Sequence, residues 1–179
     1  MYCFADYDDN AKKDLFIRGE DYVRLIDVCF RFSDLFSLVT TRNQPHGIVG
    51  APEPIFFHVH DDSKVGGWRQ TVYYYPCSEQ SKAFLLSAVD ELFSWVDCGE
   101  KHRPEDLTFY RQDGSVFFRS ETHEGVCAII NRAEEDVSSI VNQQGWKHVG
   151  SQGENAVYGV PSESNFAKFC APVVNGSFQ

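Results

Sequence analysis

Apolar residues recur along the chain with two spacings, and each spacing predicts a different kind of element. Residues 20–32 (EDYVRLIDVCFRF) carry apolar side chains three and four positions apart, which predicts a helix with one buried face. Residues 78–96 have the same spacing, and Ser78 suits the N-cap position of a second helix. The apolar stripe of this second helix consists of Leu85, Val89, Leu92 and Val96.

A third helix and a set of strands complete the predicted elements. Asn131 followed by Glu134 resembles a capping box, so the third helix is expected over residues 131–145, with Gly145 after its last turn. Short runs rich in β-branched and aromatic residues predict the strands. These runs are residues 36–41, 55–60, 69–76, 107–120, 125–130, 146–150 and 155–161.

The dipeptide Asp113-Gly114 lies between two alternating runs and predicts a β-hairpin. A two-residue turn would pair Arg111 with Val116, Tyr110 with Phe117, and Phe109 with Phe118. Large aromatic side chains would then lie on both faces of the hairpin, whereas a sheet with one wet face carries them on one. A second layer of the same chain would cover the far face, or a partner would.

Hairpins separated by single helices predict an α+β fold. We expect a single domain over residues 1–179, with a mainly antiparallel sheet and about three helices packed mostly on one of its faces. The pattern after about residue 161 determines little. The length suits one domain, and a hydrophobic content of 42% predicts a packed core.

Charge narrows the classes of function. The chain has 16 Lys and Arg against 26 Asp and Glu, a net charge of -10. This balance excludes a general nucleic-acid binder, which needs a basic face, and docking on an anionic membrane. It suits a soluble protein that meets a basic partner. The sequence shows no apolar stretch of membrane-spanning length and no signal-peptide layout, so we expect a cytoplasmic protein with reduced cysteines.

The stretch FFHVHDD, residues 56–62, resembles the start of a metal site. His58 and His60 are two apart on a predicted strand, so both imidazoles would point to one side and could share a zinc ion. Asp62, His123-Glu124 or His46 would have to supply a further ligand. The alternation of His58 and His60 with Ile55, Phe57 and Val59 also predicts a plain strand with its apolar side chains in the core and its histidines in water. We favour this second interpretation, and no cofactor is expected from it.

Cys77 is a candidate nucleophile, because it follows a strand and precedes the helix at residue 78. A helix N-terminus favours the thiolate. Glu79 opposes it, and no resolving cysteine is near. His123-Glu124 could act as an acid–base pair, but neither a nucleophile nor a phosphate loop accompanies them.

Aromatic and acidic residues form the candidate partner surface. Tyrosine and arginine are favoured at interfaces, and carboxylates speed the encounter with a basic protein. The candidate residues are Asp61, Asp62, Tyr110, Phe117, Arg119, Glu121, Glu124, Glu134 and Glu135.

Residues 72–124 carry the segment PEDLTFYR followed by SETHE. This part of the chain, about a third of it, resembles small uncharacterised bacterial proteins with a PEDLxFYR strand and an S-x-x-HE ending, some of them labelled as sporulation proteins. The matching positions include Leu92, Phe93, Trp95, Pro104, Tyr110, Arg111, His123 and Glu124. The resemblance implies a bacterial origin and transfers no function.

The sequence therefore predicts a cytoplasmic protein-binding module, an immunity-type inhibitor that occludes a basic toxin or another enzyme. Two alternatives stay open. One is an enzyme that depends on zinc through His58 and His60 or on the thiol of Cys77. The other is a regulatory subunit of an assembly.

Overall fold

A computed structural model gives the structure of the chain, and it describes residues 1–5, 7–8, 13–40, 48–61, 69–95 and 104–148. The helical elements in this part are α1 (Glu20–Phe32), α2 (Glu79–Ala88), η2 (Leu92–Ser94), η3 (Thr122–Glu124) and α3 (Ser138–Val141). The strands are β1 (Tyr2–Ala5), β2 (Tyr7–Asp8), β3 (Lys13–Asp14), β4 (Leu35–Thr40), β5 (Phe56–Asp61), β6 (Arg69–Pro76), β7 (Glu105–Tyr110), β8 (Val116–Glu121), β9 (Val126–Ile129) and β10 (Lys147–His148).

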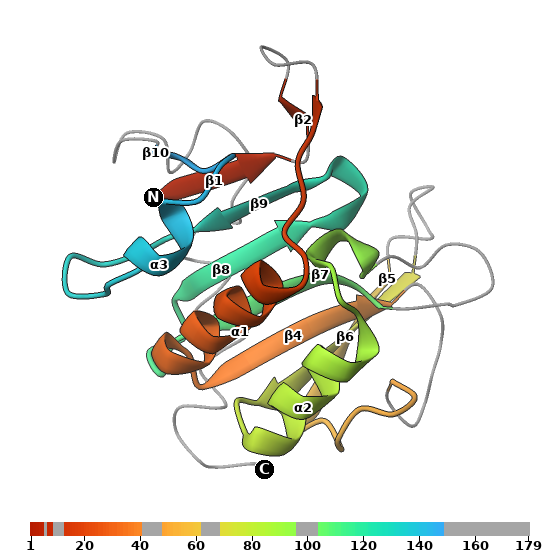
Figure 1. Ribbon diagram of the computed structural model, residues 1–179. Helices are drawn as coiled ribbons and strands as arrows, with labels where there is room; N and C mark the ends of the chain where they lie inside the picture. Colours follow the sequence, from red (N-terminus) through yellow and green to blue (C-terminus); the bar gives the residue numbers. More distant parts are fainter. Residues whose placement is uncertain (6, 9–12, 41–47, 62–68, 96–103, 149–179) are drawn as a thin grey trace.

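Eight of these strands form one sheet, and helices α1 and α2 lie together on one side of it (Figure 1). The strand order is β10-β1-β9-β8-β7-β4-β6-β5, and every pairing is antiparallel. Strands β2 and β3 form a separate small ribbon. The predicted α+β fold with a mainly antiparallel sheet is confirmed.

The core lies between α1 and the central strands. Phe30 of α1 contacts Phe36 of β4 and Phe109 of β7, with ring centroids 6.2 and 5.6 Å apart. Near the start of the same helix, Tyr22 accepts a hydrogen bond from Trp95 Nε1 at 3.0 Å and donates one to the carbonyl of Leu85 at 3.2 Å. Helix α1 occupies the predicted residues 20–32, because its apolar face meets a sheet wide enough to bury it.

Helix α2 begins as predicted and ends early. Ser78 caps it and forms a reciprocal capping box with Ser81. The prediction that the helix continues to residue 96 is wrong, since Val89 is extended (φ -144°, ψ 154°). The following residues bond to the segment before α1 instead: Gly19 N–H donates to the carbonyl of Asp90 and Leu92 N–H to the carbonyl of Ile17. Val89 and Leu92 are still buried, so the apolar spacing marks core residues that are not all helical.

The helix predicted over residues 131–145 is also mostly wrong, because only Ser138–Val141 is helical. No capping box with Glu134 forms. The carboxylate of Glu135 accepts the N–H of Arg132 at 2.7 Å and also binds Arg111, which holds residues 132–135 in a turn. Gly145 has a φ of 100°, and a Cβ there would lie 2.5 Å from the ring of Phe4.

The β7–β8 hairpin forms with a register that differs from the predicted one. Phe109 faces Phe118 as expected, but a bulge places Tyr110 opposite Val116. The loop has three residues instead of two, since Arg111 N–H donates to the carbonyl of Ser115 and Gly114, at φ 82°, follows a tight turn. The bulge turns Phe117 toward α1, where its ring lies 5.4 Å from that of Phe32. The predicted pairing of Tyr110 with Phe117 on one face is therefore wrong.

The strands nearest the two ends of the chain also differ from the prediction. Residues 147–148 form a strand, as the pattern at 146–150 predicts, but they pair with β1. The sequence reasoning did not predict β1 at Tyr2–Ala5. The strand predicted over 155–161 lies outside the described residues.

Candidate functional site

Strand β5 is an edge strand of the described sheet and exposes apolar side chains. Phe57 is 56% exposed and Ile55, just before the strand, is 45% exposed. The prediction that these two residues lie in the core is wrong, because α1 packs over β4 and β7, which are farther inside the sheet. With Val49, which is 90% exposed, they make up three of the five large exposed hydrophobic residues of the described chain. We call Ile55 and Phe57, which are two residues apart along the edge strand, the edge patch.

An aromatic row crosses the sheet face that is turned away from α1. Successive strand residues point to opposite faces, so Ser37 points away from α1 where Phe36 points toward it. The Ser37 and Tyr110 hydroxyls are 2.9 Å apart. Tyr74 lies between Tyr110 and Phe56, stacked on Phe56 at 4.2 Å. The row ends at Phe56 of β5, and Tyr110 itself is buried.

The structure separates the histidines that the zinc hypothesis would combine. His58 is in β5 and His123 is in η3, directly after β8. Strands β6, β4 and β7 lie between β5 and β8, a separation of roughly 19 Å at the usual strand spacing. The described part of the chain holds no group of three or more His, Cys, Asp or Glu placed to bind a metal. The side chains of His60 and Asp61, and all of His46 and Asp62, lie outside that part.

Cys77 lies at the N-terminal end of α2, as the sequence predicts. Its backbone N–H donates to the carbonyl of Asp34 at 2.8 Å. Burial, together with the negative charge of Asp34, raises the pKa of the Cys77 thiol to about 12. A thiol with such a pKa is protonated at neutral pH, so this environment opposes a nucleophilic role.

A cluster of charged residues lies at the open end of the β7–β8 hairpin. His123 Nε2 is 2.9 Å from Oε2 of Glu105, a buried carboxylate, so the histidine pairs with Glu105 and not with its neighbour Glu124, which is exposed. Arg119 forms an ion pair with Glu121, and both are partly buried. Burial lowers the pKa of the Arg119 guanidinium.

Asp106 is the strained residue of this cluster. Its φ of 52° is the only positive value among the described non-glycine residues, and it falls at a bulge between β4 and β7. Its carboxylate accepts the N–H of Thr122 at 2.9 Å. Burial raises the pKa of the Asp106 carboxyl, the hydrogen bond from Thr122 opposes the rise, and the neighbouring Glu105 adds to it.

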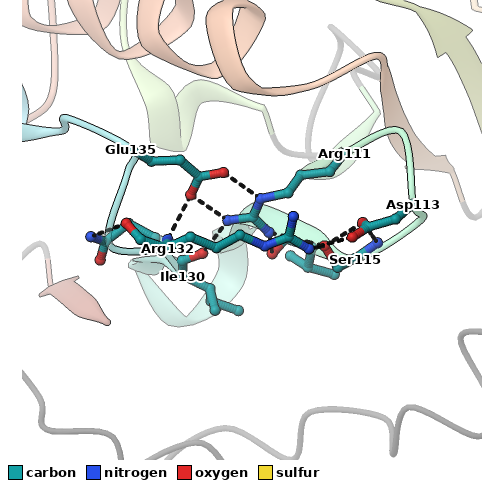
Figure 2. A network of polar contacts seen from close by, with 8 residues as sticks. Arg111, Asp113, Ser115, Ile130, Arg132 and Glu135 are labelled. Atoms are coloured by element: carbon teal, nitrogen blue, oxygen red, sulfur yellow. Dashed lines mark hydrogen bonds and ion pairs between the residues drawn. The ribbon is translucent and has the colours of Figure 1, made fainter.

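A second network lies at the turn end of the hairpin (Figure 2). Arg111 Nε and Nη2 donate to the two oxygens of Glu135 at 2.6 and 2.7 Å. Its other N–H groups reach Ser115 and the carbonyls of Val116 and Ile130. Five bonds use all five donors of a guanidinium. Arg111 and Glu135 are 7% and 8% exposed, so the pair fastens the loop after β9 to the hairpin.

The outer part of this network is exposed. Arg132 forms an ion pair with Asp113 and donates to Ser115 at 2.9 Å. The hydrogen bonds from Arg132 and Ser115 hold the pKa of the Asp113 carboxyl well below its usual range. Burial raises the pKa of Glu135, but the bonds from Arg111 and the Arg132 N–H lower it by more, so the carboxylate stays ionised. Sequence reasoning missed this network, since Arg111 and Glu135 are 24 residues apart and follow no local spacing.

The predicted partner residues thus fall into four groups. Glu124 and Glu134 are exposed, while Arg119 and Glu121 are partly buried and paired with each other. Tyr110, Phe117 and Glu135 are buried and cannot contact a partner in this conformation. For Asp61 and Asp62 the described part gives no side-chain position.

In comparisons of the chain with protein-family models, with curated proteins and with solved structures, none matched. Within the described residues, no helix is both long and apolar enough to cross a membrane.

Proposed function

We propose that this protein is a binding module for a basic partner protein, and that it acts as an immunity-type inhibitor that covers the active site of a toxin or another enzyme. The observation that carries the proposal is the edge patch. It combines an edge strand with two half-exposed apolar side chains, in a chain with a net charge of -10.

Strand addition is the binding mode that suits this edge. An extended segment of the partner would pair with the backbone of β5, and its alternate side chains would pack on Phe57 and Ile55. Phe57 already packs on Tyr73 of the neighbouring strand, with ring centroids 5.9 Å apart. Its ring is therefore held in place before a partner binds. Large aromatic side chains held in this way supply much of the binding free energy at interfaces.

Charge supports a basic partner. Glu53, two residues before Ile55, is exposed, and so are Glu124, Glu134 and Asp136 elsewhere on the described surface. Such a field steers a positively charged protein toward the surface and speeds association at low salt. Apolar contacts at β5 would then set the lifetime of the complex.

The test needs the partner itself. Capture from a lysate of the native organism, and co-expression with the product of the adjacent gene, are the routes to it. We expect Phe57→Ser to weaken the purified complex about thirtyfold or more, the effect of losing a hot-spot aromatic residue, and to relieve inhibition. Phe16→Ser is the matched control, since Phe16 is 47% exposed outside the edge patch.

The electrostatic part has its own readout. Glu134→Lys should slow association at low salt and leave dissociation nearly unchanged. Glu135 is unsuited to this test, because its charge is bound to Arg111 inside the fold. Equal affinity of Phe57→Ser and Phe16→Ser would rule out the edge patch, and an association rate that ignores both salt and charge reversal would rule out steering.

The zinc alternative stands as a second proposal on one observation: His58 and His60 lie in a strand whose register runs unbroken from Phe56 to Asp61. Metal analysis of protein purified without a histidine tag tests it. Stoichiometric zinc that disappears in the double variant His58→Ala/His60→Ala would support an enzyme, and zinc-free protein that still inhibits its partner would support the binding module.

A further inference from the structure

We propose that the partner segment that pairs with β5 is an extended run of about six residues in which apolar residues alternate with small polar ones, followed by lysine or arginine. This rests on the proposed strand addition and specifies which kind of segment performs it. The length, the direction and the side chains of the segment each follow from a different feature of β5.

The sheet sets the length and the direction of the segment. Strand β5 is an outer strand of the described sheet, and its register with β6 is unbroken over the six residues Phe56–Asp61 (Figure 1). Every pairing in this sheet is antiparallel, and antiparallel pairs are slightly more stable per residue than parallel ones. A segment that adds to β5 therefore runs antiparallel to it, with its C-terminal end beside the N-terminal end of β5.

One face of β5 selects apolar residues. Phe57 lies opposite Tyr73 of β6, whose buried ring belongs to the core on the helix side of the sheet. Val59, two residues later, points to the same side and is half-buried, and Ile55 lies just before the strand. A neighbouring strand places alternate side chains directly beside these residues, and apolar side chains there remove the exposed surface of Phe57 from water.

The opposite face of β5 excludes charged residues from the run. Phe56 stacks on Tyr74 with ring centroids 4.2 Å apart, and His58 lies opposite Val72. The β6 residues on this face opposite Phe56–His60 are Gln70, Val72 and Tyr74, and none of them is an acid. A lysine or arginine beside them would lose water without gaining a counter-charge, whereas threonine suits a half-buried pleated surface and carries only a neutral hydroxyl.

Lysine or arginine has a place just after the run. Glu53 is exposed and lies two residues before Ile55, so the two Cα atoms are at most about 7 Å apart. In an antiparallel pair, the residues after the C-terminal end of the segment lie near this glutamate. The net charge of -10 also attracts a basic segment. The basic residues of the partner therefore belong at the C-terminal end of the run.

Fluorescence anisotropy of labelled, end-blocked peptides with the whole protein tests this chemistry. We expect saturable binding of VTVTVTKR. The peptide VKVRVTTT has the same composition with its basic residues inside the run, and it should bind about tenfold more weakly because those charges lose water on binding. The peptide KRVTVTVT carries them at the other end and should bind about threefold more weakly, the effect of losing an exposed ion pair.

Variants assign the contacts to residues. Phe57→Ser should weaken binding of VTVTVTKR about tenfold or more, whereas Phe16→Ser, which removes a half-exposed ring elsewhere, should bind as wild type. Glu53→Gln should remove the advantage of VTVTVTKR over KRVTVTVT. Glu79→Gln is the matched control, because Glu79 is also exposed and its loss changes the net charge equally, and it should keep that advantage.

The outcomes separate the segment from the function. Absence of saturable binding of VTVTVTKR at millimolar concentration, or equal affinities for VTVTVTKR and VKVRVTTT, would overturn the proposed segment. If VTVTVTKR binds as expected but Phe57→Ser leaves the complex with the native partner unchanged, the proposed function fails and the segment chemistry of β5 stands.

Discussion

At the turn end of the β7–β8 hairpin, Arg111 and Glu135 satisfy each other inside the fold, whereas at the open end Asp106 is held in a left-handed conformation beside Glu105 and His123. Both ends bury carboxylates. The turn end surrounds its carboxylate with N–H donors, and the pKa of Glu135 falls. The open end buries Asp106 with fewer compensating contacts, and the pKa of Asp106 rises.

The difference shows that one hairpin can be held by a buried ion pair at one end and carry backbone strain at the other. A fully hydrogen-bonded ion pair fixes a loop in one position, and it does so whether or not it adds net stability. A carboxylate with a raised pKa and a strained backbone costs free energy that the surrounding fold must offset. Substitutions at the two ends should therefore differ in size and in their dependence on pH.

The largest effect is expected at the turn end. Glu135→Leu should lower the free energy of unfolding by about 3–5 kcal/mol, because Arg111 keeps its charge in a buried place without its partner. The double variant Arg111→Met/Glu135→Leu should recover most of this loss. Urea unfolding of the wild type, the single variant and the double variant measures both free energies. If the single variant is as stable as the double one, the unpaired Arg111 charge is not costly and the account of this ion pair is wrong.

An intermediate effect is expected at the open end. Asp106→Ala should cost about 2 kcal/mol, since it removes the acceptor for Thr122 N–H and leaves a Cβ at positive φ without a local hydrogen bond. Asp106→Gly should cost less, because glycine adopts this φ without strain. The same unfolding experiment compares them. If glycine costs as much as alanine, the backbone at Asp106 is not strained.

The smallest effects are opposite in their pH dependence. The folded pKa of Asp106 is raised, so its charge destabilises the fold above that pKa, and Asp106→Asn should stabilise at neutral pH and lose this gain as pH falls. The folded pKa of Asp113 is lowered, so its contribution is present above the unfolded pKa near 3.8 and is lost as pH falls through the folded pKa.

Asp113→Asn should thus destabilise slightly at neutral pH, by less than about 1 kcal/mol because the ion pair with Arg132 is exposed. Thermal unfolding of both variants between pH 2 and pH 7 measures the two trends. Parallel curves would contradict the contrast between the two ends.

Sequence reasoning was most successful where one local pattern decides the structure. Helix α1 matches its predicted range, because its apolar spacing, its acidic first turn and its burial agree. It was less successful where a distant contact competes. The apolar spacing at Val89 and Leu92 is helical, but the backbone there bonds to Ile17 and Gly19 instead.

The site was harder to predict for the same reason. Asp113-Gly114 identifies the turn, but the loop length and the bulge decide on which face of the sheet Phe117 lies. A register shift of one residue moves a side chain to the opposite face. Phe57 alternates like a core residue, yet it is exposed because its strand lies at the edge of the sheet. Strand order is set by long-range pairing, which a local pattern does not contain.

Hydrogen exchange of the backbone amides of β5, with and without the purified partner, tests the central claim most directly. If a partner strand adds to this edge, amides within Phe56–Asp61 become protected on binding, and the edge patch is the contact surface. Protection confined to another surface, with β5 exchanging as in the free protein, would contradict the claim.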